Sequence, residues 1–118
     1  MSLQLSDVRI FDIKDKKEIK TALLCLTECD SDFLGDNGEE YLQDEAKKAG
    51  YNNNADFYAD KAINSLPDNY DDTDVSAVIR QYVYDWMEHD SYYIDYRVGT
   101  TYVSKNSLHV FLAYIDND

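Results

Sequence analysis

Carboxylates are the side chains whose spacing in this sequence could do chemistry, and the densest run lies in residues 30–41. An EF-hand loop places oxygen ligands at positions 1, 3, 5 and 12 and glycine at position 6, so that six to eight oxygens surround Ca²⁺. The residues that match this pattern are Asp30, Asp32, Gly35 and Asp36. Leu34 at position 5 and Tyr41 at position 12 do not match, and the bidentate glutamate is the strongest ligand. We therefore expect no metal site and no cofactor.

Other catalytic chemistry is not indicated. His89 and His109 stand without a Ser or Cys nucleophile motif, and there is no glycine-rich phosphate loop. Cys25 and Cys29 are four residues apart on an expected helix, where Cβ atoms lie about 5–6 Å apart, too far for good disulfide geometry. Carboxylate pairs occur throughout, so two neighbouring acids do not mark an acid–base site. We expect reduced thiols and no enzyme.

The acids are concentrated in two segments. Residues 21–46 carry eight acids and no Lys or Arg, for −8, and residues 62–96 carry eight acids and one base, Arg80, for −7. The remaining residues add +2, which leaves the net charge of −13. A magnitude of roughly 2 to 8 is enough to keep a small domain soluble. We predict that these acids bind a cationic partner: Glu28, Asp30, Asp32, Asp36, Glu39, Glu40, Asp44, Glu45, Asp68, Asp71, Asp72 and Asp74.

Two interpretations of these segments stay open. Each acid taken singly is ordinarily a solvated side chain or a helix cap that complements the helix dipole. Like charges at this density repel one another and cost stability, which favours a function for the group as a whole. Carboxylates spaced three or four residues apart can approximate the phosphates of B-form DNA, which carry one charge per roughly 3.4 Å of axis on each strand.

In size, acidity and mixed α/β pattern the chain resembles the bacterial and phage DNA-mimic proteins, and among them the small monomeric mimic that binds the histone-like protein HU. The resemblance covers the whole chain and involves no shared motif. It implies a monomer that occupies the DNA-binding face of a basic protein, a nucleoid-associated protein first of all. The cluster Lys14, Lys16, Lys17 and Lys20 departs from the pattern and would have to face away from that partner. The alternatives are an immunity protein that neutralises a nuclease toxin and an acidic metal-binding module.

Apolar periodicity predicts the helices that position these acids. Residues 74–89 carry a stripe at helical spacing, made of Val75, Val78, Ile79, Tyr82, Val83 and Trp86. We expect this to be the core helix, with Thr73 or Asp72 as its N-cap. Three further helices are expected, at residues 15–29, 39–49 and 54–65. The first carries a buried stripe of Ile19, Ala22, Leu23 and Leu26. The second has Gly50 as its C′ residue, and the third has Asn54 as its cap.

Strands are expected at both ends of the chain. Residues 8–13 are rich in β-branched and aromatic side chains, and after Asp90 the period changes to two. Strands are predicted at 92–98, 101–104 and 108–115, with a turn at Gly99 and another at 105–107. The last strand is apolar on both faces, as in a central, covered strand. The prediction is an α+β fold: an N-terminal strand, about four helices and a C-terminal three-stranded antiparallel meander, with the helices packed on one sheet.

Composition limits the class of protein. The 118 residues fit one domain, 1–118, and 44% apolar with 14% aromatic residues is too rich for a disordered chain. No apolar run reaches the length of a membrane span, and the N-terminus lacks the layout of a secretory signal, so we expect a cytoplasmic protein. A charge of −13 repels nucleic acid and anionic membranes. We expect neither as a direct ligand.

Overall fold

The computed structural model describes residues 2–28, 30–36, 39–89, 97–104 and 106–116, and its elements follow the α+β order. Along the chain they are β1 (Ser2–Asp12), α1 (Lys16–Leu26), the short 3₁₀ helix η1 (Glu39–Tyr41), α2 (Asp44–Lys48), α3 (Asn54–Asn64), α4 (Asp72–His89), β2 (Arg97–Ser104) and β3 (Ser107–Asp116). The described part of the chain therefore contains one N-terminal strand, four α-helices and a C-terminal pair of strands.

The three strands form one antiparallel sheet in the order β1-β3-β2. The prediction that all three strands of the sheet are C-terminal was wrong. The sheet contains two C-terminal strands and the N-terminal strand β1, which pairs with β3 along its length. Gly99, predicted as a turn, lies within β2 opposite Leu112. Residues 92–96 of the predicted strand 92–98 lie outside the described residues. Of the predicted turn at 105–107, Asn106 lies in a turn, Ser107 is the first residue of β3 and pairs with Ser104, and residue 105 lies outside the described residues.

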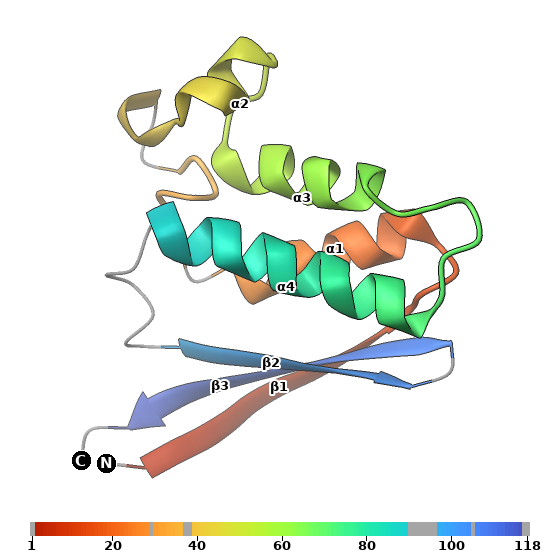
Figure 1. The fold of residues 1–118 in the computed structure, drawn as a ribbon. Coiled ribbons are helices and arrows are strands. Elements are labelled where there is room, and N and C mark those ends of the chain that lie inside the picture. The colour runs from red at the N-terminus through yellow and green to blue at the C-terminus, as the bar shows by residue number, and fades with distance from the viewer. Residues whose placement is uncertain (1, 29, 37–38, 90–96, 105, 117–118) are drawn as a thin grey trace.

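The helices cover one side of the sheet in two layers (Figure 1). α1 packs on β1 and β3, and α4 packs on β2. α3 lies against α1 and α4 on the side away from the sheet, and α2 lies beyond α3 as the element farthest from the strands. Among the described residues, α1 and α4 therefore make the main contacts with the sheet, while α3 completes the core on the side away from it.

The core is built by the predicted stripes. Ile19, Ala22, Leu23 and Leu26 of α1 are buried, and of the α4 stripe only Val83 stays half-exposed. Burying a large apolar side chain contributes about 1.5–3 kcal/mol, so this contact between helices and sheet dominates the stability. On β3, Leu108, Val110 and Leu112 are buried, while His109 and Phe111 on the alternate side are half-buried. The strand is central, as predicted, but helices cover only one of its faces.

The two caps lie one or two residues upstream of the predicted positions. α3 is capped by Asn53, whose side chain accepts a hydrogen bond from the N–H of Asp56. At α4 the N–H of Asp74 donates to Asp71 Oδ1, and the N–H of Asp71 donates to Asp74 Oδ2, so Asp71 takes the place predicted for Thr73 or Asp72. In each case a residue just upstream carries an equally suitable side-chain oxygen. Gly50 ends α2 with φ +85°, as predicted.

The helix predicted at 39–49 is broken in two. Asn54, predicted as a cap, is 2% exposed and lies in the first turn of α3. Its side-chain oxygen accepts from the N–H of Gln43, and its amide donates to the carbonyl of Tyr41. These bonds occupy backbone groups that a continuous helix would have paired internally, so η1 and α2 remain separate. Within the part of the chain that the structure describes, no helix is long and apolar enough to cross a membrane.

Candidate functional site

The twelve acids predicted to bind a partner fall into different environments, and Asp30 is buried. Its side chain is 1% exposed: Trp86 Nε1 donates to Oδ2 at 2.7 Å, and the N–H of Phe33 donates to Oδ1 at 3.1 Å. Asp32, two residues on, is also buried. A carboxylate held in the core by hydrogen bonds is not accessible to a partner, so Asp30 belongs to the scaffold, and the burial of Asp32 removes it from the exposed acids as well. Asp30 also has both oxygens engaged, which leaves it poorly placed to ligate a cation.

Phe33 explains why this acidic loop enters the core. Its ring is fully buried and stacks on Tyr58, with centroids 6.0 Å apart, and meets Tyr82 edge-on. Its carbonyl accepts the N–H groups of Asn54 and Ala55 at the start of α3. Gly35 then passes so close that a Cβ there would lie 2.6 Å from the Cβ of Asn53. The loop 30–36 is therefore fastened to the N-terminal end of α3.

Glu28 is compensated by a cation. Arg9 of β1 contacts it through two nitrogens, at 2.9 and 3.3 Å, and donates from Nη1 to Cys25 Sγ at 3.0 Å. Asp7 completes the cluster at 2.6 Å from Arg9 Nε. The hydrogen bonds that Arg9 donates to Glu28, and after it to Cys25 and Asp7, raise the pKa of Arg9 above its ordinary value. Cys25 is a free, buried thiol, whereas Cys29 lies outside the described residues.

The acids that remain exposed in the first segment gather around the N-terminal end of α3. The loop 30–36 and the η1–α2 segment both attach there, through Phe33 and Asn54. We call their exposed acids the α3 N-terminal acid group, which consists of Asp36, Glu40, Asp44 and Glu45. Glu45 is 3.8 Å from Lys61, and both side chains are exposed, which makes this pair weak. Among the described residues no cation lies within ion-pair distance of the other three members. Glu39 belongs to η1 beside them.

The second acidic segment has a different character. Asp71 and Asp74 cap α4 through their reciprocal hydrogen bonds, Asp72 is half-buried, and Asp68 is exposed. An open hollow of about 510 Å³ separates this connector from the end of β1, and Lys14 lines it together with three of these acids. Bases therefore share this end of the molecule with the acids, and the segment is only partly an acidic surface.

Aromatic contacts hold the basic cluster against this connector. The hydroxyl of Tyr70 donates to the carbonyl of Ile13 at 2.6 Å, and Lys16 Nζ lies 5.9 Å from the centre of the Tyr70 ring. Tyr70 therefore joins the connector to the end of β1 and has a structural role. Tyr84 is 63% exposed on α4 and remains available.

The two acidic groups lie at opposite ends of α3 (Figure 1). The α3 N-terminal acid group surrounds the start of the helix, and the connector 65–71 leaves its other end. Eleven residues at about 1.5 Å rise separate the two ends by about 16 Å. The structure thus brings the exposed acids of residues 36–45 together and keeps Asp68 apart from them.

Two acids that were not predicted as site residues form the strongest ionic contact of α3. Lys20 of α1 lies 2.9 Å from Asp60 and 3.6 Å from Asp56, and the hydroxyl of Tyr51 donates to Asp60 at 2.5 Å. Burial opposes ionisation of Asp60, but the hydrogen bonds from Tyr51 and Lys20 lower its pKa below the ordinary value. The hydrogen bond to Asp60 likewise raises the pKa of Lys20. The i, i+4 spacing of Asp56 and Asp60 on one helix face was the available signal.

No metal cluster of three or more His, Cys, Asp or Glu side chains is present among the described residues. Comparison with protein-family models, with curated proteins and with solved structures finds no match to this chain. The surface itself therefore has to carry any functional proposal.

Proposed function

We propose that this protein binds a basic, DNA-binding protein of the histone-like kind and occludes its DNA-binding surface, without catalysing a reaction. The observation that supports this most is the α3 N-terminal acid group. Three of its four members have no cation within ion-pair distance among the described residues, although the chain carries Lys side chains nearby in α2. Exposed charges left uncompensated in a chain of net charge −13 repel one another, which a complementary partner would relieve.

The ordinary role of acids as solvated side chains or helix-dipole complements accounts for part of the α3 N-terminal acid group. Asp44 and Glu45 occupy the first turn of α2 and complement its dipole. Asp36 and Glu40 lie outside any α-helix and have no such role. Phosphate imitation therefore rests most directly on Asp36 and Glu40, where the scaffold holds the backbone through Phe33 and Asn54. Rigid presentation limits the entropy lost on binding.

The partner surface that fits this group is one rich in Lys and Arg. DNA would need the same cations, so the protein should displace DNA and should not bind DNA itself. Within this proposal the protein acts in the cytoplasm, and each copy of the chain binds a nucleoid-associated protein on its own. The second acidic segment would contribute less, because Lys14 and Lys16 lie beside it.

The test uses purified HU and a fluorescent 20-base-pair duplex as probes. We expect the protein to release the duplex from HU, as read by anisotropy, and the variant Glu39→Gln, Glu40→Gln, Asp44→Asn, Glu45→Gln to need at least tenfold more protein. Losses in the association rate and in salt sensitivity should account for most of the change. The matched control is Asp68→Asn with Asp72→Asn, which removes acids from the other end of α3 and should change the midpoint less than threefold.

Two outcomes would contradict the proposal. A ternary complex that retains DNA on the same HU surface would refute occlusion. A folded fourfold variant with unchanged affinity, beside a Tyr84→Ala variant that loses binding, would replace phosphate imitation with an ordinary aromatic contact on α4. If the protein captured a basic nuclease from a bacterial lysate and did not release DNA from HU, the same acidic surface would instead belong to an immunity protein that neutralises a nuclease toxin.

A further inference from the structure

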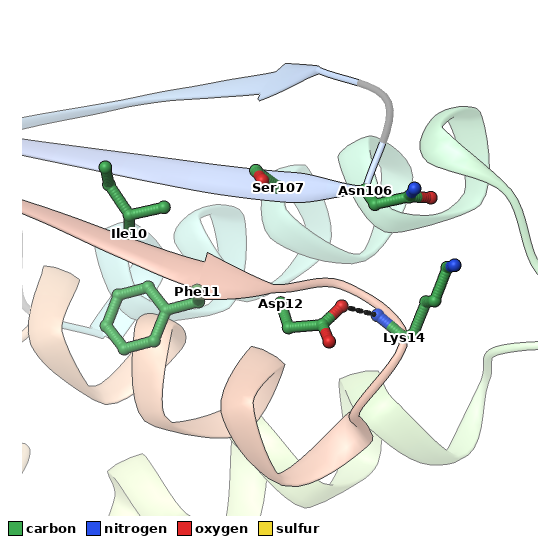
Figure 2. Close-up of a pocket in the computed structure, with 6 residues that line it drawn as sticks. All are labelled: Ile10, Phe11, Asp12, Lys14, Asn106 and Ser107. Atoms are coloured by element: carbon green, nitrogen blue, oxygen red, sulfur yellow. Dashed lines mark hydrogen bonds between the residues drawn. The ribbon is translucent and has the colours of Figure 1, made fainter.

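Within the part of the chain that the structure describes, no helix covers one face of the sheet, which we call the bare face. All the helices lie on the other side of the three strands (Figure 1). On the bare side Ile10 is 65% exposed and Val8 43% exposed, and they pair across the ladder with His109 and Phe111. Figure 2 shows Ile10 and Phe11 pointing to opposite sides of β1, with Ser107 of β3 beside them. Phe11 packs against the core, so Ile10 points away from it.

This face is more apolar than a solvated sheet face needs to be. An antiparallel sheet with one side in water ordinarily alternates apolar and polar side chains. Here β3 carries Phe111 and His109 outward, in edge-to-face contact with centroids 6.3 Å apart, while Leu108, Val110 and Leu112 fill the core side. A contiguous apolar surface on a sheet marks an interaction site.

The distribution of charged side chains indicates which partner can cover the bare face. Among the described side chains on the bare face, Asp12 at its end is the only Asp, Glu, Lys or Arg, and there the face borders a hollow of about 380 Å³ that Lys14 also lines. The α3 N-terminal acid group lies on the far side of the molecule, around α2 (Figure 1). A basic partner is drawn to that acidic end. Another copy of this chain, with the same charge of −13, is repelled from it and can approach through the bare face, whose described charged groups are confined to one end.

We propose that the bare face of β1 and β3, centred on Ile10 and Phe111, is the interface between two copies of this chain. Packed face to face, two sheets lie about 10 Å apart, and their acidic ends point in opposite directions. At physiological salt the Debye length is about 8 Å, so the repulsion between those distant ends is screened.

The size of the face sets the strength of the contact. Three strands spaced about 4.8 Å apart and roughly ten residues long, at about 3.3 Å per residue, present about 450 Å². Two copies therefore bury about 900 Å², less than the roughly 1,600 Å² of a standard stable interface. The dimer should be reversible and form at micromolar concentrations or above.

Sedimentation velocity of the full chain from 5 to 500 µM tests this proposal. The wild type should shift from monomer to dimer within that range, and Ile10→Lys should raise the dissociation constant at least thirtyfold. The matched control is Met87→Lys, which changes a 45% exposed apolar side chain on α4 and should leave the dissociation constant within twofold. Circular dichroism checks folding, and Val8→Lys replaces Ile10→Lys if the latter does not fold.

A wild type that stays monomeric at 500 µM would overturn the proposal and leave the face to another partner. A dimer that Met87→Lys disrupts and Ile10→Lys does not would place the interface on α4. The fourfold acid variant should still dimerise, so this proposal and the proposed function can fail independently.

Discussion

The buried contact between Asp30 and Trp86 should hold the acidic loop in the core and contribute nothing to partner binding. We predict that Trp86→Phe and Asp30→Asn each destabilise the fold while leaving the affinity for a basic partner within twofold. The reason is local: Asp30 is 1% exposed and both of its oxygens accept hydrogen bonds, at 2.7 and 3.1 Å. Trp86→Phe removes one donor and leaves a buried carboxylate short of a partner.

The magnitude follows from the chemistry of the bond. A hydrogen bond to a charged group contributes about 1.5–3 kcal/mol, and replacing the indole by the smaller phenyl ring adds about 1 kcal/mol of lost packing. Trp86→Phe should therefore cost about 3 kcal/mol, which lowers the Tm by about 10 °C in a domain of this size. Asp30→Asn should cost about 2 kcal/mol. The amide has one acceptor oxygen where the carboxylate has two, so its NH₂ group must face one of the two N–H donors.

A double-mutant cycle separates the bond from the packing. Urea unfolding of the wild type, the two single variants and the double variant should return a coupling energy of about 2 kcal/mol. Asp44→Asn is the control, since this acid is exposed, and it should change stability by less than about 0.5 kcal/mol. If Asp30→Asn were as mild as Asp44→Asn, the carboxylate would not anchor the loop, and Asp30 would return to the set of candidate partner contacts.

Two further predictions concern the scaffold around α3. Because the folded-state pKa of Asp60 is lowered from 3.8, its contribution to stability is present above that pH and disappears as the pH falls through the lower, folded-state value. Urea midpoints of wild type and Asp60→Asn should therefore differ at pH 7 and converge toward pH 3; a difference that persists at pH 2 would contradict the ionic origin. Gly35→Ala should destabilise the fold by about 3 kcal/mol, because its Cβ would lie 2.6 Å from Asn53 Cβ. Gly50→Ala should destabilise the fold by about 1 kcal/mol, because only its φ of +85° is unfavourable. Equal thermal shifts for the two glycine variants would show that the close approach is absent.

The helices that carry the core were predictable because their signal is local. The stripes of α1 and α4 repeat at helical spacing, and every member but Val83 is buried. The place of β1 in the sheet was not, because its partner β3 lies at the other end of the chain and strand pairing leaves no local mark. The break between η1 and α2 likewise depends on the side chain of Asn54, more than ten residues downstream of the carbonyl it binds.

The candidate site was predictable in composition and not in geometry. Asp30 and Asp36 look alike in the sequence, yet one is buried and the other exposed. The apolar pair Phe33–Leu34 inside the acidic loop was the usable signal, since a loop that dips into the core carries neighbouring residues with it. Charge counting treats all eight acids of the segment as equal, whereas the fold compensates Glu28 with Arg9 and leaves four others exposed around α3.

The separation of charge from apolar surface has a consequence for stoichiometry. α2 lies on the side of the helices away from the sheet, so in a face-to-face pair the two α3 N-terminal acid groups point apart (Figure 1). One small partner cannot reach both groups at once, and without simultaneous contact a dimer gains no avidity. Each chain should then bind one partner whether or not it is paired. Titration of HU at protein concentrations below and above the dimerisation midpoint should return the same molar ratio and the same affinity, whereas a tighter complex with the dimer would mean that the acid groups face a common side.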